Sequence, residues 1–296
     1  MSIHRVRLKS ECLSCIARKY IDKYPANSTE EQQIHYKKAI FKVLSEAEIT
    51  DSAPVLTKKI TDVQEKIFGE TTDYSRIKAF YNDFVMKMLP KIEEGIVRAE
   101  DSLLRAIQYS MTGNYIDFGA LAEVDKEKFE QLLRDVSNIK ISDLEFETLK
   151  KELEQAERLV FLTDNCGEIV FDMAFIKLLK KQLPKLRITV IVRGLPTIND
   201  ATMEDAGQIG LNKEVCVLEN GNGVAGTCLE MLSEEAKECL LAADLVIAKG
   251  QGNFETLMGC GLNVYYIFMC KCNMFAKRFH TNLYEGLLLN DRRLVL

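Results

Sequence analysis

The sequence predicts an α/β protein with a helical N-terminal domain, residues 1–155, and a three-layer α/β/α Rossmann-like domain, residues 156–296, built on a mainly parallel sheet. Three observations support this fold class. Only four of the 16 glycines precede residue 150, which indicates helices first and strands with turns afterwards. The apolar run Leu159 to Leu162 is continuous, as in a central parallel strand buried on both faces. After residue 158, strand patterns alternate with helix patterns, which favours a parallel sheet covered by helices.

The first half of the chain carries apolar residues at helical spacing. Ser52 followed by Pro54 is a plausible start for one helix, because proline is tolerated in the first helical turn. Residues 113–119, Gly-Asn-Tyr-Ile-Asp-Phe-Gly, interrupt the pattern and on their own favour a turn between two helices. The expected helical stretches are residues 34–44, 55–67, 77–89, 92–108, 129–136 and 146–157.

The second half is expected to hold five strands separated by turns and helices. The predicted strands are Leu159–Leu162, Arg187–Arg193, Val215–Leu218, Asp244–Ala248 and Val264–Met269. The segments between them that can each hold a helix are Glu168–Leu183, Asp200–Gln208, Ser233–Ala242 and Phe254–Cys260.

Polar residues follow the first predicted strand directly. Asp164, Asn165 and Glu168 fall at its carboxyl end, where ligands collect in open α/β sheets. Asn165 and Glu168 also fit a helix capping box, which is a purely structural role. Capping does not account for Asp164, because a carboxylate at the end of an apolar strand is costly to desolvate without a cation or a hydrogen-bond donor.

The second predicted strand brings more polar residues to the same edge of the sheet. It ends at Arg193, and Asn199 and Asp200 follow shortly afterwards. Asp200 could serve only to cap the next helix. Two Asp carboxylates and an amide oxygen are, however, hard ligands suited to Mg²⁺ or Mn²⁺.

The fourth predicted strand leads into Lys249 and then Gly250-Gln251-Gly252. An ammonium group beside glycine backbone N–H groups is suited to phosphate. The order of residues is not that of a P-loop. Residues 221–226 form a glycine-rich turn without the acidic residue that a dinucleotide-binding motif requires, although their amides could still bind an anion.

Composition disfavours several classes of protein. The net charge is −5 and no basic stripe is present, which disfavours a nucleic-acid partner. We find no secretory signal and no apolar run long enough to cross a membrane, so we expect no membrane partner. Nine scattered cysteines favour reduced thiols and a cytoplasmic location.

The cysteines leave several interpretations open. Cys12 with Cys15, and Cys270 with Cys272, could bind zinc or iron, act as redox thiols, or simply pack. Cys166 has no histidine nearby in the sequence, and the chain has only three histidines. This argues against a Cys-His nucleophile pair and against a histidine-rich zinc hydrolase.

Several motifs in order resemble the DUF89 family, also called the damage-control phosphatases. They are Asp164 to Glu168, Asn199 to Thr202, Asp244 to Lys249, and Gly250 to Glu255. The Cys12-x-x-Cys15 pair and residues 113–119 resemble its prokaryotic-type branch. The match spans nearly the whole chain, and motifs that agree in order are more specific than any one of them.

The resemblance implies a phosphatase with a divalent metal, Mg²⁺, Mn²⁺, Co²⁺ or Ni²⁺, in a cleft between the two domains. Its expected substrates are small phosphomonoesters, such as sugar phosphates or damaged phosphometabolites, hydrolysed by metal-assisted attack of water. A phospho-aspartate on Asp164 is the chemical alternative, ranked lower because no Asp-x-Asp signature follows the first strand. The rival from another class is a non-catalytic nucleotide- or metabolite-binding protein. The physiological substrate and the oligomeric state stay open.

The resemblance also assigns residues to the site. Asp164, Asn165 and Asp200 would hold the metal, and Asp164, Lys249 and Glu168 would act in catalysis. Two residues of the 113–119 segment would face the cleft, which reverses the preference for a plain turn. The residues expected to bind phosphate or the rest of the substrate are Lys249, Gly250, Gly252, Asn253, Glu255, Asn114, Asp117 and Arg193.

Overall fold

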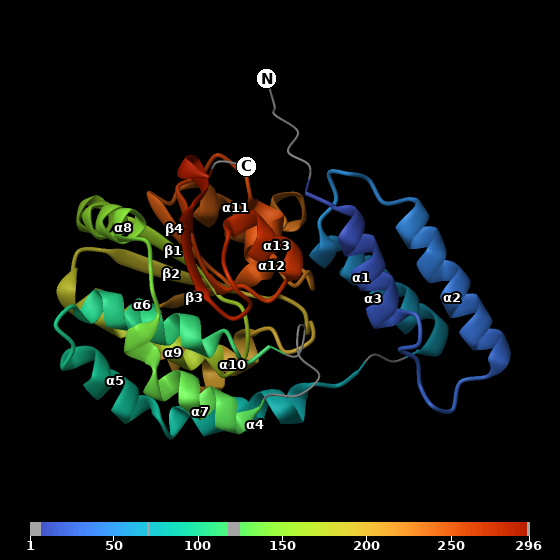
Figure 1. The fold of residues 1–296 in the computed structure, drawn as a ribbon, viewed down its shortest axis with the longest axis horizontal. Helices are drawn as coiled ribbons and strands as arrows, with labels where there is room; N and C mark the ends of the chain where they lie inside the picture. Colours follow the sequence, from blue (N-terminus) through green and yellow to red (C-terminus); the bar gives the residue numbers. More distant parts are fainter. Residues whose placement is uncertain (1–6, 70–71, 118–124, 295–296) are drawn as a thin grey trace.

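A six-stranded sheet forms the centre of the fold (Figure 1). The computed structural model describes residues 7–69, 72–117 and 125–294. Its strands are β1 (Arg158–Leu162), β2 (Arg187–Val192), β3 (Cys216–Glu219), β4 (Leu245–Lys249), β5 (Val264–Met269) and β6 (Gly286–Asn290). The five predicted strands are confirmed and run parallel in the order β3-β2-β1-β4-β5. Strand β6 was not predicted, and it pairs with β5 in the antiparallel direction.

The strand order creates a crevice at one edge of the sheet. Strands β2 and β3 lie on one side of β1, and β4 and β5 lie on the other. Such a reversal is a topological switch point, where ligands bind beyond the carboxyl ends of the strands. Leu162, the last residue of β1, is in register with Ile191 of β2 and Ala248 of β4. The segments that follow these three strands therefore emerge close together.

Helices cover both faces of the sheet. One face, which includes Phe161 and Ile247, packs against α4 (Ser75–Met86), α5 (Leu89–Val97), α6 (Ser102–Gly113), α7 (Lys126–Arg134), α8 (Asp143–Gln155), α9 (Glu168–Gln182) and α10 (Met203–Gln208). The other face, which includes Val160 and Val246, packs against α11 (Glu234–Leu241), α12 (Gly250–Leu257) and α13 (Asn273–Phe279). The predicted three-layer α/β/α class is confirmed.

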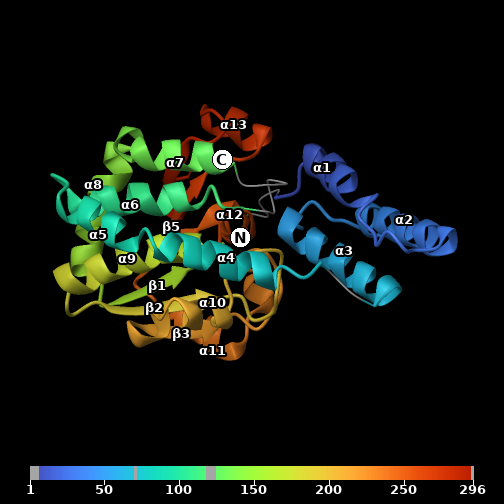
Figure 2. The ribbon, with the colours of Figure 1, turned by 90° about the horizontal axis from the view of Figure 1, so that it is seen from below.

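The first three helices form a unit of their own, which we call the cap: α1 (Ser10–Tyr20), α2 (Glu30–Ser45) and α3 (Ala53–Phe68). Figures 1 and 2 show the cap, in blue, beside the rest of the protein. Helix α2 begins with a capping box between Thr29 and Gln32, and α3 has Pro54 in its first turn after Ser52, as predicted. The cap has a separate buried cluster: Leu8, Ile16, Tyr20, Tyr36, Ile40, Leu56 and Ile60.

The predicted domain boundary near residue 155 stays a prediction. The buried clusters show that α4 to α8 share one core with the sheet, whereas the cap has its own. None of the helices in the described ranges is both long enough and apolar enough to span a membrane.

Several segments differ from the expected secondary structure. The stretch 92–108 is divided between α5 and α6, and α1 was not predicted. Helix α12 begins at Gly250 and not at Phe254, so Gly250-Gln251-Gly252 is the first turn of a helix. Helix α6 ends at Gly113, and residues 114–117 leave it as a turn and coil. Phe118 and Gly119, the end of the predicted 113–119 segment, lie outside the described residues.

Candidate active site

Backbone hydrogen bonds join the segment after β1 to the loop after β2. The N–H of Ala201 donates to the carbonyl of Asp164 at 2.7 Å, and the N–H of Cys166 donates to the carbonyl of Asn199 at 2.8 Å. Asn165 and Asp200 form an isolated antiparallel bridge. The structure thus brings together the three predicted metal ligands, Asp164, Asn165 and Asp200, at the switch point.

Two amide side chains hold the carboxylates of this segment. The Nδ2 of Asn165 donates to Asp164 Oδ2 at 2.7 Å and to Glu168 Oε2 at 3.0 Å. The Nδ2 of Asn114 donates to the same two oxygens, at 3.0 and 2.9 Å, and its Oδ1 accepts from the N–H of Met269. Asn114 is fully buried. It therefore faces the site from the end of α6 and is more than a turn residue.

Arg193 lies inside the cluster and is 1% exposed. Its Nε donates to Asp200 Oδ2 at 2.7 Å, and its Nη1 donates to Asn253 Oδ1 at 3.3 Å. The remaining nitrogen, Nη2, lies 3.6 Å from Asp164 Oδ1 and has no hydrogen-bond partner among the described residues. A buried guanidinium with an unused donor is an energetic cost unless a ligand supplies the acceptor.

Lys249 is fully buried behind Glu168. Its ammonium donates to Glu168 Oε1 at 2.7 Å, to Asp172 Oδ1 at 2.9 Å and to the carbonyl of Ser110 at 3.0 Å. All three of its donors therefore have acceptors within the protein. Asp172 was not predicted from the sequence, although it follows Glu168 by four residues and so lies on the same face of α9.

Glycine permits the close packing of α12 against Asp164. Gly250 has φ +79°, and a Cβ atom there would lie 1.9 Å from Asp164 Oδ2. At Gly252, a Cβ would lie 2.0 Å from the carbonyl oxygen of Ala225. Because the first N–H groups of a helix have no intrahelical partners, the start of α12 presents free donors beside Asp164. Asn253, one residue further, ties the helix to β1 by donating to the carbonyl of Thr163 at 3.0 Å.

The other two predicted substrate residues, Asp117 and Glu255, are held by neighbours outside the cluster. Asp117 forms an ion pair with Lys271 at 2.6 Å, and its charge raises the pKa of both Asp164 and Asp200. Glu255 accepts a hydrogen bond from Gln251 at 2.8 Å, and burial raises its pKa to about 7.

The pKa values of the site show that its carboxylates are crowded. Burial, followed by the charges of Glu168 and Asp200, raises the pKa of Asp164 well above its usual range. Burial raises the pKa of Asp172 and of Asp200 to about 6, against the opposing charges of Lys249 and Arg193. Burial alone would lower the pKa of Lys249, but the charges of Asp172 and Glu168 outweigh it and raise that pKa.

The buried charges at this edge do not balance. When each buried cation is matched with one buried carboxylate, two carboxylates have no cation. The missing positive charge equals that of one divalent metal ion. At this edge, the buried cations among the described residues are Lys78, Arg193 and Lys249, and the buried carboxylates are Asp164, Glu168, Asp172, Asp200 and Asp205. One further described carboxylate, Asp291, is buried at the opposite end of the sheet, where it accepts hydrogen bonds from Gly259 and Tyr266.

Within the described part of the chain, no group of three or more His, Cys, Asp or Glu side chains is arranged to hold a metal ion. The predicted set, Asp164, Asn165 and Asp200, is of a different kind, because it has two carboxylates and an amide. Oxygen ligands of this type suit Mg²⁺ or Mn²⁺, which complete their coordination with water and phosphate. The donor set and the charge deficit therefore fit a divalent cation.

The structure gives no support for catalysis by a cysteine thiol at this edge of the sheet. Burial raises the pKa of Cys166, which disfavours the thiolate. Each of the nine cysteines is free. Burial also raises the pKa of Cys12, and Glu255, Cys272 and Cys15 are close enough to raise it further.

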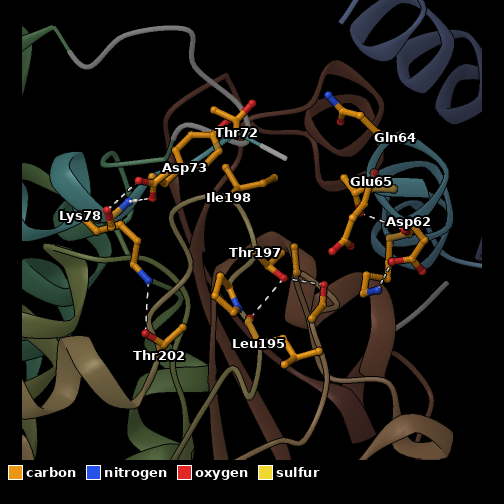
Figure 3. A pocket seen from close by; sticks show the side chains of 18 of the residues that line it. Asp62, Gln64, Glu65, Thr72, Asp73, Lys78, Leu195, Thr197, Ile198 and Thr202 are labelled. Carbon is orange, nitrogen blue, oxygen red and sulfur yellow. Dashed lines mark hydrogen bonds and ion pairs between the residues drawn. The ribbon is translucent and has the colours of Figure 1, made fainter. Parts of the chain in front are cut away.

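A cavity of about 470 Å³ lies between the cap, α4 and the loop after β2 (Figure 3). Lys78 and Thr202 are on its wall, where the ammonium donates to Thr202 Oγ1 at 3.3 Å. Because Thr202 follows Asp200 by two residues, the cavity adjoins the cluster. Ile198, also on the wall, has φ +44°, a strained conformation for a β-branched residue. This cavity was not predicted from the sequence, because segments that are far apart in the chain form it.

Comparisons with known proteins agree on one family. The family model described as the damage-control phosphatase ARMT1-like domain matches residues 8–287. A damage-control phosphatase of Archaeoglobus fulgidus is 33% identical over 244 residues, which are 80% of this chain and 83% of that protein. One from Pyrococcus horikoshii is 28% identical over 278 residues, 92% of this chain and 94% of that one. The crystal structure of a DUF89 family protein of P. horikoshii has a TM-score of 0.80 at 24% identity and covers 96% of this chain and 99% of its own.

Proposed function

The chain belongs to the damage-control phosphatase ARMT1-like domain family, and from this premise we propose that it is a divalent-metal-dependent hydrolase of small phosphomonoesters. Membership confirms the resemblance to the DUF89 family and supports a phosphatase. The observation that carries the finer proposal is the deficit of two positive charges among the described buried side chains at the switch point, next to an arginine with an unused donor.

Asp164, Asn165 and Asp200 would hold the cation. A divalent ion bound there would lower the pKa of a coordinated water and polarise the phosphoryl oxygens. Asn114 and Glu168 would keep these ligands in place, since Asn114 binds Asp164 directly and Glu168 accepts from Asn165. Such supporting contacts fix the orientation of a metal's ligands.

The phosphoryl group would lie between Arg193 and the start of α12. The Nη2 of Arg193 has no partner in the described part of the protein and would donate to one phosphoryl oxygen. The first N–H groups of α12, from Gly250 to Gly252, would donate to others, and the helix dipole favours an anion at this end. These donors would stabilise the charge that develops during hydrolysis.

The predicted contact between Lys249 and phosphate remains part of the proposal with one condition. The ammonium is engaged with Glu168, Asp172 and Ser110, so a phosphoryl group would have to replace one of these acceptors. Attack by water stays ranked above a phospho-aspartate, because Asp164 Oδ2 already accepts hydrogen bonds from Asn114 and Asn165.

Release of inorganic phosphate tests the proposal. Protein stripped with a chelator is assayed against a panel of sugar phosphates, with and without Mg²⁺, Mn²⁺, Co²⁺ or Ni²⁺. We expect turnover only when metal is added and none from Asp164→Asn. The matched control is Asp244→Asn, which changes a largely exposed aspartate at the opposite end of the sheet. Turnover at an equal rate without metal, or none from the parent under any condition, would rule the proposal out.

A further inference from the structure

Tyr20 is a cap residue that meets the cavity. It is the last residue of α1 and is 1% exposed. Its hydroxyl has no hydrogen-bond partner among the described residues. Burial raises the pKa of Tyr20, and the nearby Thr57 hydroxyl opposes this shift. Tyr20 and Thr57 both line the cavity beside the predicted metal site. A buried hydroxyl without a partner is unfavourable, and it identifies a position where a ligand could supply one.

Charged groups of the cap and of the predicted metal site lie near Tyr20. The ammonium groups of Lys19 and Lys23 lie 5.5 and 5.6 Å from the centre of its ring. Asp200, one of the predicted metal ligands, is near enough to raise its pKa. A substrate that occupies both the predicted metal site and the cavity would therefore lie against Tyr20.

The cavity wall indicates what kind of group it accepts. Two of its three ammonium groups are in ion pairs, Lys58 with Asp62, and Lys78 with Asp205 at 2.7 Å. Carboxylates on the wall outnumber ammonium groups by five to three, so a second phosphate or a carboxylate would be repelled. Hydroxyls and amides, such as Thr197 and Gln64, line the remainder. This combination suits an uncharged leaving group that carries several hydroxyls.

We propose that the cavity is the leaving-group subsite and that Tyr20 is a specificity residue, which donates its hydroxyl to a hydroxylated leaving group. The inference rests on the proposed function, since it needs the phosphoryl group to occupy the edge formed by Asp164 and Arg193. It adds that the cap contributes directly to substrate recognition.

The test compares Tyr20→Phe with Tyr36→Phe. Tyr36 is a matched control, because it is also a fully buried cap tyrosine whose hydroxyl has no partner in the described ranges, and it does not line the cavity. Each variant is assayed with a sugar monophosphate and with phenyl phosphate, whose leaving group has no second hydroxyl. Thermal melts and inhibition by inorganic phosphate are measured in parallel.

For Tyr20→Phe we expect kcat/KM to fall about three- to tenfold with the sugar phosphate, the range for one lost hydrogen bond. Phenyl phosphate turnover, phosphate inhibition and the melting temperature should match the parent, and Tyr36→Phe should match it throughout. An unchanged Tyr20→Phe, or an equal loss with both substrates, would overturn the inference. A parent that hydrolyses neither ester would instead overturn the proposed function, and this inference with it.

Discussion

Lys249 is enclosed by acceptors, although the sequence suggested an ammonium open to phosphate. It lies between Glu168 and Asp172, which are themselves fully buried. Taking the cation away would leave two carboxylates facing each other in a nonpolar interior. Breaking a buried ion pair from one side costs far more than the net contribution of the pair.

We therefore predict that Lys249→Met lowers the free energy of unfolding by about 3–5 kcal/mol, as measured by urea denaturation. Lys177→Met on the same helix as Glu168 is the control, because its ion pair with Glu93 is partly exposed and should be worth about 1 kcal/mol or less.

Adding Asp172→Asn to Lys249→Met removes one of the stranded carboxylates, so the double variant should recover part of the lost stability. If Lys249→Met were as stable as the parent but no longer inhibited by phosphate, the ammonium would bind the substrate and would not stabilise the folded protein.

Glu255 gives a prediction about pH. Burial raises its pKa from 4.5 to about 7, so the folded state binds a proton that the unfolded state has already released across this range. The free energy of unfolding should then decrease as pH rises from about 4.5 to about 7 and level off above that. Glu255→Gln keeps an acceptor for Gln251 and should show a smaller decrease, measured by urea denaturation between about pH 5.5 and 8. The remaining decrease comes from buried carboxylates such as Asp172 and Asp200, whose pKa values are raised to about 6.

Glu285→Gln is the control for Glu255. Hydrogen bonds from Thr281 and Asn282 lower the pKa of Glu285 to about 2, so its contribution is present above about 4.5 and is lost only as pH falls toward 2. Glu285→Gln should therefore leave the pH dependence of the free energy of unfolding near pH 7 unchanged. Equal slopes in the parent and in Glu255→Gln would show that Glu255 is not the titrating group.

Among the elements, α12 has the strictest requirement on sequence. Its first residue, Gly250, combines φ +79° with a position against Asp164. Gly210 has almost the same backbone, φ +76°, but a Cβ atom added there would meet no described atom within 4 Å. Comparing substitutions at Gly210 and Gly250 therefore separates the cost of the left-handed backbone from the cost of steric overlap with Asp164.

Gly210→Ala should cost about 1 kcal/mol in unfolding free energy, from the left-handed backbone alone. Gly250→Ala should cost more and should also displace Asp164, so we expect loss of turnover and of stabilisation by Mn²⁺, followed by thermal melts. Similar effects from the two substitutions would mean that Asp164 has room to move and that α12 does not define its position.

The elements that the sequence predicted are those with strong local patterns. The five parallel strands are short apolar runs bounded by polar residues, and β1 is the clearest of them. Strand β6 was not predicted because it is a partly exposed edge strand whose leucines favour helix as much as strand. The start of α12 was not predicted because Gly-x-Gly normally indicates a loop. The close contacts of Gly250 with Asp164 and of Gly252 with Ala225 explain why glycines stand in this first helical turn.

For the whole molecule, the sequence predicted what the sheet topology brings together. Asp164 and Asp200 follow two neighbouring parallel strands, and Lys249 ends a third, so the rule for strand ends was enough to place them at one edge. Tyr20 and the cavity depend on how the cap rests against α4 and the β2 loop. Ser110 and Asp172 depend on how α6 packs on α9. Such contacts between distant helices leave no periodic signal in the chain.

We propose that a divalent cation fills the charge deficit at the switch point. Asp164 would be the critical ligand, because burial and neighbouring carboxylates already raise its pKa. Asp164→Asn removes that repulsion, and its amide oxygen can still accept from Asn114 and Asn165. The metal-free variant should therefore be at least as stable as the metal-free parent. Asp200→Asn also loses the ion pair with Arg193 and is the less clean test.

Thermal melts of chelator-treated protein, with and without Mn²⁺, show whether the cation binds at Asp164. The parent should gain RT ln(1 + [M]/Kd), about 2.7 kcal/mol at a hundredfold excess of metal over the dissociation constant. Asp164→Asn should lose most of this gain, and Asp244→Asn should keep all of it. A parent that Mn²⁺ does not stabilise, or a full metal-induced shift in Asp164→Asn, would contradict the account.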